Sequence, residues 1–349
     1  MGAETVRRWF LPTLLALSSL GLDSISLQAQ EPRPRTQIVE DLYDAQLLDA
    51  NEGWAVGAFG SVYHTIDGGK HWLGQGTPTT QHLYGVSFAN VENGWVVGRS
   101  GTILHTADGG AHWVAQQSNT SKHLFNVRFL DSQEGWAVGD WSVVLHTTNG
   151  GVTWRDRSLG EDRILYAVDF VDRDTGWMVG ELGSIRRTID GGRTWARQQV
   201  GMQKTLFGLA AVSKDKAWAV GIDGLVVRTV DGGVTWQVQR GEGEVESLER
   251  VGSPESLENA GLYDIEIRGG KGYAVGDVGN LLVSEDAGES WTRVLLPAEW
   301  RLSWIRGLSV LPSGRGIVVG ASGLTFAVDG RDMHFSQNTA AAAIGGQID

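Results

Sequence analysis

The chain has 349 residues, with 49 glycines, 15 tryptophans, no cysteine and a net charge of −12. The lack of cysteine excludes disulfides, thiolate metal sites and cysteine nucleophiles. The acidic balance disfavours non-specific binding to nucleic acid or anionic lipid, both of which require a basic surface. The excess of glycine and tryptophan predicts many tight turns around a repeated, large apolar anchor.

The N-terminus has the pattern of an export signal. Arg7 and Arg8 precede an apolar run over residues 9–22, and a polar stretch that ends near the small residue Ala29 follows it. This order predicts a signal peptide over residues 1–29, because the apolar run is short for a bilayer-spanning helix. An uncleaved membrane anchor is the alternative, and the paired arginines leave both the general and the twin-arginine export route open. Either route predicts a periplasmic or extracellular protein.

After an N-terminal segment over residues 30–40, one sequence motif repeats every 41 residues. The second copy has an alternating run at 83–88, the string Gly-Trp-Val-Val-Gly at 94–98, a β-rich run at 103–106, and then Asp108-Gly109-Gly110 and Trp113. The glycine that closes the Gly-Trp string recurs at Gly57, Gly98, Gly139, Gly180 and Gly221, and two looser copies end at Gly276 and Gly320. Each copy predicts four short strands.

Four strands at this period are typical of a propeller blade, which buries both of its faces only against neighbours in a ring. The sequence therefore predicts an all-β, seven-bladed β-propeller with four antiparallel strands per blade over residues 41–338. Closure of the ring is left open between strand pairing by residues 36–39 and packing alone. We expect one tryptophan per copy to act as a wedge between blades: Trp72, Trp113, Trp154, Trp195, Trp236 and Trp291.

Two segments depart from the repeat. An acidic insertion at 241–261 is either a solvated loop or a loop that contacts a partner, and the Ala- and Gly-rich tail at 339–349 is predicted to be disordered. Three tryptophans also lie outside the repeat positions, and each either anchors a partner or packs against the last blade: Trp141, Trp300 and Trp304.

The string Thr65-x-Asp67-Gly68-Gly69-x-x-Trp72 resembles the Asp-box, or BNR repeat, of sialidases and other propellers. An Asp-Gly pair favours a tight hairpin turn, because both residues tolerate positive φ. The resemblance implies a structural turn remote from any active site. The acidic residue of this turn recurs in six copies, with asparagine in the third: Asp67, Asp108, Asn149, Asp190, Asp231 and Asp286.

The Gly-Trp-x-Val-Gly string combined with the Asp-box resembles the photosystem II stability and assembly factor family over residues 42–330. The resemblance implies a non-enzymatic, exported propeller that binds newly made reaction-centre protein, in the thylakoid lumen if the host is photosynthetic. Similar chains also occur in bacteria without photosynthesis. We therefore expect a monomeric assembly scaffold that is peripheral to the membrane at most. Its expected partner is a protein, such as a membrane-protein segment or reaction-centre protein, and not a nucleic acid.

Equivalent positions of successive copies carry basic side chains or histidines. The residue before the Asp-box threonine is, in copies one to five, His64, His105, His146, Arg187 and Arg228. Equivalent positions in a ring lie on one circle, so these residues predict a partner-binding arc, and the arginines in it resemble the arginine patch of the family. Arginine offers a planar fork for carboxylates. Arg99, which follows a turn glycine, joins this candidate set. The alternative is that these side chains satisfy backbone groups between blades.

A metal-binding or enzymatic function is the minority hypothesis. Three histidines at one repeat position suggest a metal, but blades are spaced too widely for ligands that must lie about 2 Å from one ion. No metal and no cofactor are therefore predicted. The alternative function is an Asp-box glycoside hydrolase, either sialidase-like or xyloglucanase-like, which needs an arginine triad with a tyrosine nucleophile or two carboxylates across a cleft. The sequence shows no such convergent set, so we expect no enzyme.

Overall fold

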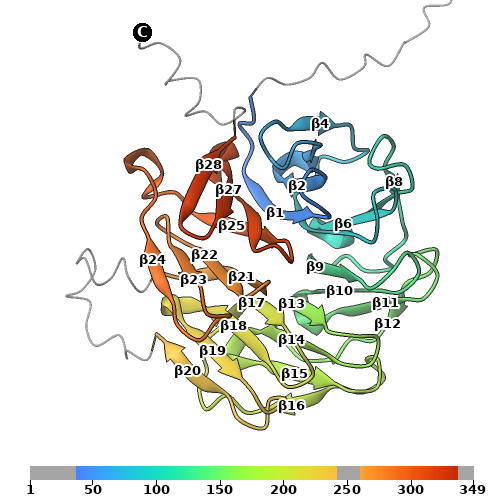
Figure 1. Ribbon diagram of the computed structural model, residues 1–349. Coiled ribbons are helices and arrows are strands. Elements are labelled where there is room, and N and C mark those ends of the chain that lie inside the picture. The colour runs from blue at the N-terminus through green and yellow to red at the C-terminus, as the bar shows by residue number, and fades with distance from the viewer. Residues whose placement is uncertain (1–36, 242–259, 337–349) are drawn as a thin grey trace, which may run out of the picture. The chain divides into compact units, whose positions relative to one another are not determined.

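The computed structural model describes residues 37–241 and 260–336, which form seven four-stranded antiparallel sheets (Figure 1). The sheets are the blades of a β-propeller, so the predicted fold is confirmed. The predicted signal peptide, most of the acidic insertion and the tail at 339–349 lie outside the described residues. Within those residues, no helix is long and apolar enough to cross a membrane.

Each blade consists of four strands that are consecutive in the chain. Blade 1 contains β1 (Leu42–Leu47), β2 (Gly53–Gly57), β3 (Val62–Thr65) and β4 (Leu73–Gln75). Blade 2 contains β5 (Leu83–Phe88), β6 (Gly94–Gly98), β7 (Ile103–Thr106) and β8 (Val114–Ala115). Blade 3 contains β9 (Leu124–Phe129), β10 (Gly135–Gly139), β11 (Val144–Thr147) and β12 (Arg155–Asp156). Blade 4 contains β13 (Leu165–Phe170), β14 (Gly176–Gly180), β15 (Ile185–Thr188) and β16 (Ala196–Gln198).

The last three blades follow the same order. Blade 5 contains β17 (Leu206–Ala211), β18 (Ala217–Gly221), β19 (Val226–Thr229) and β20 (Gln237–Arg240). Blade 6 contains β21 (Leu262–Arg268), β22 (Lys271–Gly276), β23 (Leu281–Ser284) and β24 (Thr292–Val294). Blade 7 contains β25 (Ile305–Val310), β26 (Arg315–Gly320), β27 (Thr325–Asp329) and β28 (Asp332–Phe335).

The described helical residues are single 3-10 turns. One such turn joins the second and third strands of six blades: η1 (Ala58–Gly60), η2 (Arg99–Gly101), η3 (Asp140–Ser142), η4 (Glu181–Gly183), η5 (Ile222–Gly224) and η8 (Ala321–Gly323). A further turn, η7 (Ala298–Trp300), precedes blade 7. The middle residue of each of the first six turns has positive φ although it is not glycine, with φ between 52° and 59°. Bulky residues adopt this conformation rarely.

The core lies between the blades. The second strands are buried on both faces, and in blades 1 to 3 their tryptophan stacks on a phenylalanine of the next blade, as Trp54 does on Phe88 with ring centroids 3.7 Å apart. The wedge tryptophans contact the preceding blade as predicted. The indole of Trp113, for example, donates to the Gln75 side chain at 3.3 Å. These apolar contacts bury both faces of each blade, which one blade cannot do alone.

The ring closes without exchange of a strand. Blade 1 is built entirely from the N-terminal end and blade 7 from the C-terminal end, and residues 37–39 form no strand. Ile38 and Leu42 pack in one apolar cluster with Ile317 of blade 7. The Leu47 amide donates to the Ser309 hydroxyl at 2.9 Å across the same joint. Packing and side-chain hydrogen bonds therefore close the ring, which decides the alternative that the sequence left open.

The tryptophans outside the repeat have different environments. Trp300 is buried in the cluster between blades 6 and 7. Trp304 is half-buried and stacks on Tyr43 with centroids 5.9 Å apart. Trp141 is 52% exposed at the tip of η3, where the Lys122 ammonium lies 4.4 Å from its ring. Packing against the last blade is thus correct for Trp300, whereas Trp141 remains available to a partner.

Candidate functional site

The first strands of the seven blades surround the central channel, where they lie next to one another (Figure 1). Each of them has a register shift at its second residue. Such a β-bulge places two residues opposite one on the partner strand and re-aims the side chains. In these strands the buried first residue is followed by two residues that are half-buried in several blades, as with Tyr43 and Asp44 after Leu42.

The bulged positions form a closed ring of aromatic side chains and one arginine, which we call the collar. Neighbouring ring centroids from Tyr43 to Tyr263 are between 4.9 and 5.5 Å apart. The guanidinium of Arg306 lies 5.0 Å from the ring of Tyr263 and 5.8 Å from that of Tyr43, so it closes the circle. The members of the collar are Tyr43, Tyr84, Phe125, Tyr166, Phe207, Tyr263 and Arg306.

The tyrosines of the collar are protonated at neutral pH. Burial raises the pKa of Tyr43, Tyr84 and Tyr166. Burial, with a hydrogen bond to the Asp277 carboxylate at 2.8 Å, raises the pKa of Tyr263 to about 12. The collar is therefore uncharged except for Arg306, and its aromatic residues line the channel.

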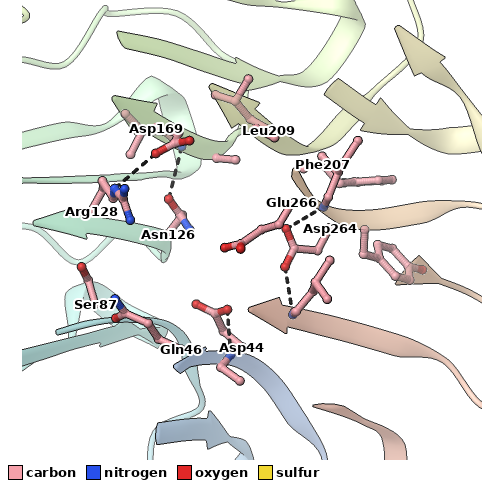
Figure 2. Close-up of a pocket in the computed structure, with 18 of the residues that line it drawn as sticks. Asp44, Gln46, Ser87, Asn126, Arg128, Asp169, Phe207, Leu209, Asp264 and Glu266 are labelled. Carbon is pink, nitrogen blue, oxygen red and sulfur yellow. Dashed lines mark hydrogen bonds and ion pairs between the residues drawn. The ribbon is translucent and has the colours of Figure 1, made fainter. Parts of the chain in front are cut away.

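Beneath the collar lies a cavity of about 440 Å³ that is lined by the first strands. Figure 2 shows that Asp44, Asp264 and Glu266 point into it from blades 1 and 6. Each carboxylate accepts a hydrogen bond from the next blade: Asp44 from the Val86 amide at 2.9 Å, Asp264 from Leu308 at 3.0 Å and Glu266 from Val310 at 2.7 Å.

These bonds satisfy backbone amides of the innermost strands that have no partner in their own sheet. The first strand is the edge of its sheet, and an edge strand has backbone amides without a ladder partner. Polar side chains of the preceding blade satisfy them around the channel, since Asn126 accepts from Val168 and Ser87 accepts from Phe129 in the same way. The channel carboxylates thus have a structural role between blades.

The environment of this cavity disfavours the ionised form of its carboxyl groups. Burial raises the pKa of Asp44 to about 7, with repulsion from Glu266 as a further cause. Burial raises the pKa of Asp264 well above its usual range, and the charges of Asp44 and Glu266 add to the effect. Glu266 also has a raised pKa through burial, but it lies 3.6 Å from the Arg268 guanidinium, which favours its charge.

The loops at the two ends of the channel differ, and we name the two faces accordingly. The collar face carries the turns η1–η5 and η8 and the connections between blades, as the bond from the Arg99 amide to the His82 carbonyl shows. The turn face carries the Asp-box turns and the loops between first and second strands, which bond to each other through the Gly68 amide and the Asn51 carbonyl.

The Asp-box residues hold hairpin turns, as the resemblance implied. In blade 1 the Thr65 hydroxyl donates to Asp67 at 3.0 Å and accepts from the Gly69 amide at 2.9 Å, and Asp67 accepts from the His71 amide at 2.9 Å. Asn149 makes the corresponding bonds in blade 3. In four further blades, hydrogen bonds from residues of the same turn lower the pKa of the carboxyl to about 2: Asp108, Asp190, Asp231 and Asp286.

The three histidines of the predicted arc lie near the turn face, and each stacks on the second-strand tryptophan of its own blade. The centroid distances are 4.5 Å for His64 on Trp54, 4.6 Å for His105 on Trp95 and 3.8 Å for His146 on Trp136. His64 and His146 also pair with the carboxylates of Glu52 and Glu134. Burial lowers the pKa of His105 and of His146.

The two arginines of the arc link blades. Arg187 lies 5.0 Å over the ring of Trp177 and donates to the Lys214 carbonyl of blade 5 at 2.7 Å. Arg228 pairs with Glu289 of blade 6. The structure thus brings all five residues to equivalent positions and gives His64, His146, Arg187 and Arg228 intramolecular hydrogen-bonding partners. Partner binding by the arc stays a prediction.

Arg99 does not belong to the arc. It is exposed at the start of η2 on the collar face, directly after Gly98, whose partner in the sheet is Leu83. The histidine of the same blade, His105, lies at the other end of the second strand, opposite Trp95. Within the described residues, no group of three or more His, Asp or Glu side chains could hold a metal ion.

Sequence reasoning missed the collar, although its signal is present. In six blades a leucine followed by Tyr or Phe opens the first strand, and in blade 7 Ile305-Arg306 takes this place. An aromatic residue in an alternating strand is equally typical of the core, so the pattern alone does not direct it to the channel. Only the bulge decides this direction.

Comparison with known proteins agrees with this architecture. The family model of photosynthesis system II assembly factor YCF48 matches residues 74–162, 153–239 and 193–302, which together are more than half of the chain. The chain belongs to the YCF48 family. No curated protein matches it.

Solved structures of YCF48 share the fold. One of them, YCF48 bound to D1 peptide, is 17% identical with a TM-score of 0.65, and the match covers 86% of this chain and 92% of that one. YCF48 from Cyanidioschyzon merolae is 18% identical with a TM-score of 0.63, over 86% and 96%. The GH74 xyloglucanase from Xanthomonas campestris is 12% identical with a TM-score of 0.65, over 88% of this chain and 54% of the enzyme. At these identities the likeness shows the propeller fold and nothing finer.

Proposed function

We propose that this YCF48-family protein is a non-catalytic, exported assembly scaffold that binds a segment of a membrane protein on its collar face. The observation that carries the proposal is the collar itself, a closed ring of six aromatic side chains and Arg306 at one mouth of the channel. Aromatic and arginine side chains dominate the binding energy of protein interfaces. One YCF48 structure contains a D1 peptide, which favours a reaction-centre segment as the class of partner.

The loops around the collar support this choice of face. Phe59, Trp141 and Leu182 occupy the tips of η1, η3 and η4, and they are 71%, 52% and 48% exposed. All three have positive φ, which is costly for a side chain of this size. Large apolar side chains that these turn tips hold in water add little to the core of the propeller, and they suit contact with a partner.

A binding experiment tests the proposal and separates the two faces. The purified protein is used to capture partners from the native envelope fraction, and the captured protein is then titrated in purified form. We expect saturable binding that falls at least tenfold in the triple variant Phe59→Ser, Trp141→Ser and Leu182→Ser. The matched control replaces three exposed apolar residues of the turn face, Ile66, Val152 and Val234, with serine and is expected to bind normally.

Variants of the predicted arc test whether the partner binds the turn face instead. If the double variant Arg187→Glu and Arg228→Glu loses binding while the collar-face variant retains it, the partner contacts the turn face and the collar proposal is wrong. The absence of any saturable partner in the envelope would contradict the scaffold function altogether. Cell fractionation with an antibody tests the exported location, and recovery in the cytoplasm would contradict it.

The likeness to xyloglucanases favours one alternative, a glycoside hydrolase. Such enzymes need two carboxyl groups that flank the scissile bond. The channel carboxyls of Asp44 and Asp264 are instead engaged with backbone amides of neighbouring strands. The chain also spans about half of the length of the xyloglucanase that it resembles. Incubation with xyloglucan and with sialosides is expected to give no product, and turnover that one Asp or Glu substitution abolishes would overturn the non-catalytic proposal.

A further inference from the structure

We propose that the channel beneath the collar is a binding site for one linear alkylammonium group, either a lysine side chain or a free diamine, with the ammonium at Asp44 and Asp264. The inference does not depend on the scaffold function or on the identity of a protein partner. It depends on three features of the channel: its aromatic entrance, its uncompensated carboxyls and its size.

The entrance suits a cation on an apolar stem. The faces of tyrosine and phenylalanine rings attract cations, most strongly where the site is desolvated. Six such rings encircle the mouth, with neighbouring centroids no more than 5.5 Å apart. The methylene groups of a lysine or diamine are also stabilised when they leave water for such an apolar environment.

The carboxyls directly below lack a countercharge. Asp44 and Asp264 follow the collar residues Tyr43 and Tyr263 in the chain, and Figure 2 shows both side chains directed into the channel. Across residues 37–241 and 260–336, no lysine or arginine forms an ion pair with either carboxyl. Each carboxylate accepts two backbone hydrogen bonds, and a carboxylate has about four acceptor positions, so capacity for an ammonium remains.

Charge repulsion makes a bound cation favourable. The charge of Glu266 raises the pKa of Asp44, and the charges of Asp44 and Glu266 raise the pKa of Asp264. An opposite charge a few ångströms away favours the ionised form. Binding of an ammonium would therefore release a proton from Asp44 near neutral pH. Arg306 opposes an entering cation, but it is exposed at the rim, where salt screens it.

The cavity volume of about 440 Å³ accommodates such a group, and the site continues towards the turn face. A second cavity at that end shares Gln46, Arg128, Glu266 and Arg268 with the first. There the Arg128 guanidinium lies 3.2 Å from the Asp169 carboxylate, so the charge of that carboxylate is balanced. Among the described carboxyls that line the two cavities, those of Asp44 and Asp264 have no ion-pair partner, so we place the ammonium there.

Calorimetric titration of the full chain tests the site. The probes are 1,5-diaminopentane and the peptide acetyl-Gly-Lys-Gly-amide, at pH 8 and low salt, with 1-pentanol and acetyl-Gly-Gln-Gly-amide as neutral counterparts. We expect saturable binding of at least one amine and at least tenfold weaker binding of its counterpart. Binding of the peptide alone assigns the site to a partner's lysine, and binding of the diamine alone assigns it to a free amine. If neither amine binds, or if the neutral probes bind equally well, the proposal is wrong.

The decisive variant is Asp44→Asn with Asp264→Asn. Asparagine removes both charges and keeps one carbonyl oxygen per side chain, which can accept the amide of the neighbouring blade, from Val86 or Leu308. Amine affinity is expected to fall at least tenfold. Asp332→Asn, on the exposed outer strand β28, is the matched control and retains wild-type affinity. Unchanged affinity in the double variant overturns the proposal.

A second measurement applies if the double variant does not fold. Amine affinity of the wild-type protein is expected to rise severalfold from pH 6 to pH 8, because the Asp44 carboxyl, with a pKa of about 7, ionises in this range while an alkylamine stays protonated. An affinity that does not change with pH would contradict binding at these carboxyls.

Discussion

The two faces of this propeller are built from the same repeat, but they use it differently. On the turn face, six blades repeat one hydrogen-bonded device in which a Thr or Ser hydroxyl and an Asp or Asn side chain hold the hairpin. On the collar face, the backbone of the turns repeats while their middle residues vary: Phe59, Ser100, Trp141, Leu182, Asp223 and Ser322. A fold that is stabilised at one end of its blades leaves the other end free to vary its chemistry.

The largest effect should distinguish two tryptophans of blade 3. Trp136 is 1% exposed and stacks on His146, so Trp136→Ala should lower the free energy of unfolding by about 3–5 kcal/mol. Trp141, at the tip of η3, should tolerate alanine with a change of less than about 0.5 kcal/mol. Chemical denaturation of both variants checks this. Equal losses would mean that the collar-face tips support the fold, and the contrast between the faces would fail.

The next effect is a gain of stability in the channel. Because burial shifts the pKa of Asp44 from 3.8 to about 7, the unfolded state binds fewer protons than the folded state between these values. The free energy of unfolding therefore falls as the pH rises through this window. Asp44→Asn cannot ionise, so it should be more stable than the wild type by about 1–3 kcal/mol at pH 8 and nearly equal to it at pH 4. Urea titrations at both pH values test this, and a variant that is less stable at pH 8 would contradict it.

A smaller difference should separate two threonines of blade 2. The Thr106 hydroxyl is buried in the Asp-box turn, where it donates to Asp108 at 2.9 Å and accepts from Gly110 at 2.8 Å. Thr106→Val should lower the free energy of unfolding by about 1–3 kcal/mol, because it leaves a buried backbone amide without an acceptor. The matched control is Thr102→Val, at a residue whose hydroxyl donates to the Arg99 carbonyl on the collar face. It should lower the free energy of unfolding by less than about 0.5 kcal/mol. Thermal melts of both variants decide the comparison.

The smallest effect is expected at the Asp-box carboxylates themselves. Asn149 already makes the bonds of the turn in blade 3, so Asp231→Asn should leave the melting temperature at pH 7 nearly unchanged. Hydrogen bonds from Thr235 and Thr229 lower the pKa of Asp231 to about 2, so its charged form favours the folded state above pH 3.8, and this contribution is lost as the pH falls through about 2. A large loss at pH 7 would show that the charge, and not the hydrogen bonding, holds the turn.

The sequence predicted the Asp-box turns in detail because their partners lie within four residues of each other. Thr65, Asp67 and Gly69 form one hairpin, and the chemistry of that hairpin does not depend on where the blade lies. The predicted arc shows the limit of the same reasoning. Its five residues do lie at equivalent positions, but the tryptophan stacking of His64 and the bond from Arg187 to the neighbouring blade are not visible in a repeat alignment.

The number of blades, the four strands of each and the turns between them were determined by the sequence alone, since local alternation, Gly-containing turns and a 41-residue period encode them. Tertiary structure alone decided the collar, the uncompensated carboxyls and the closure between Ile38 and blade 7. Each of these joins residues from different blades around one axis, and the bulges that aim Tyr43 and its counterparts into the channel follow from strand pairing and not from residue type.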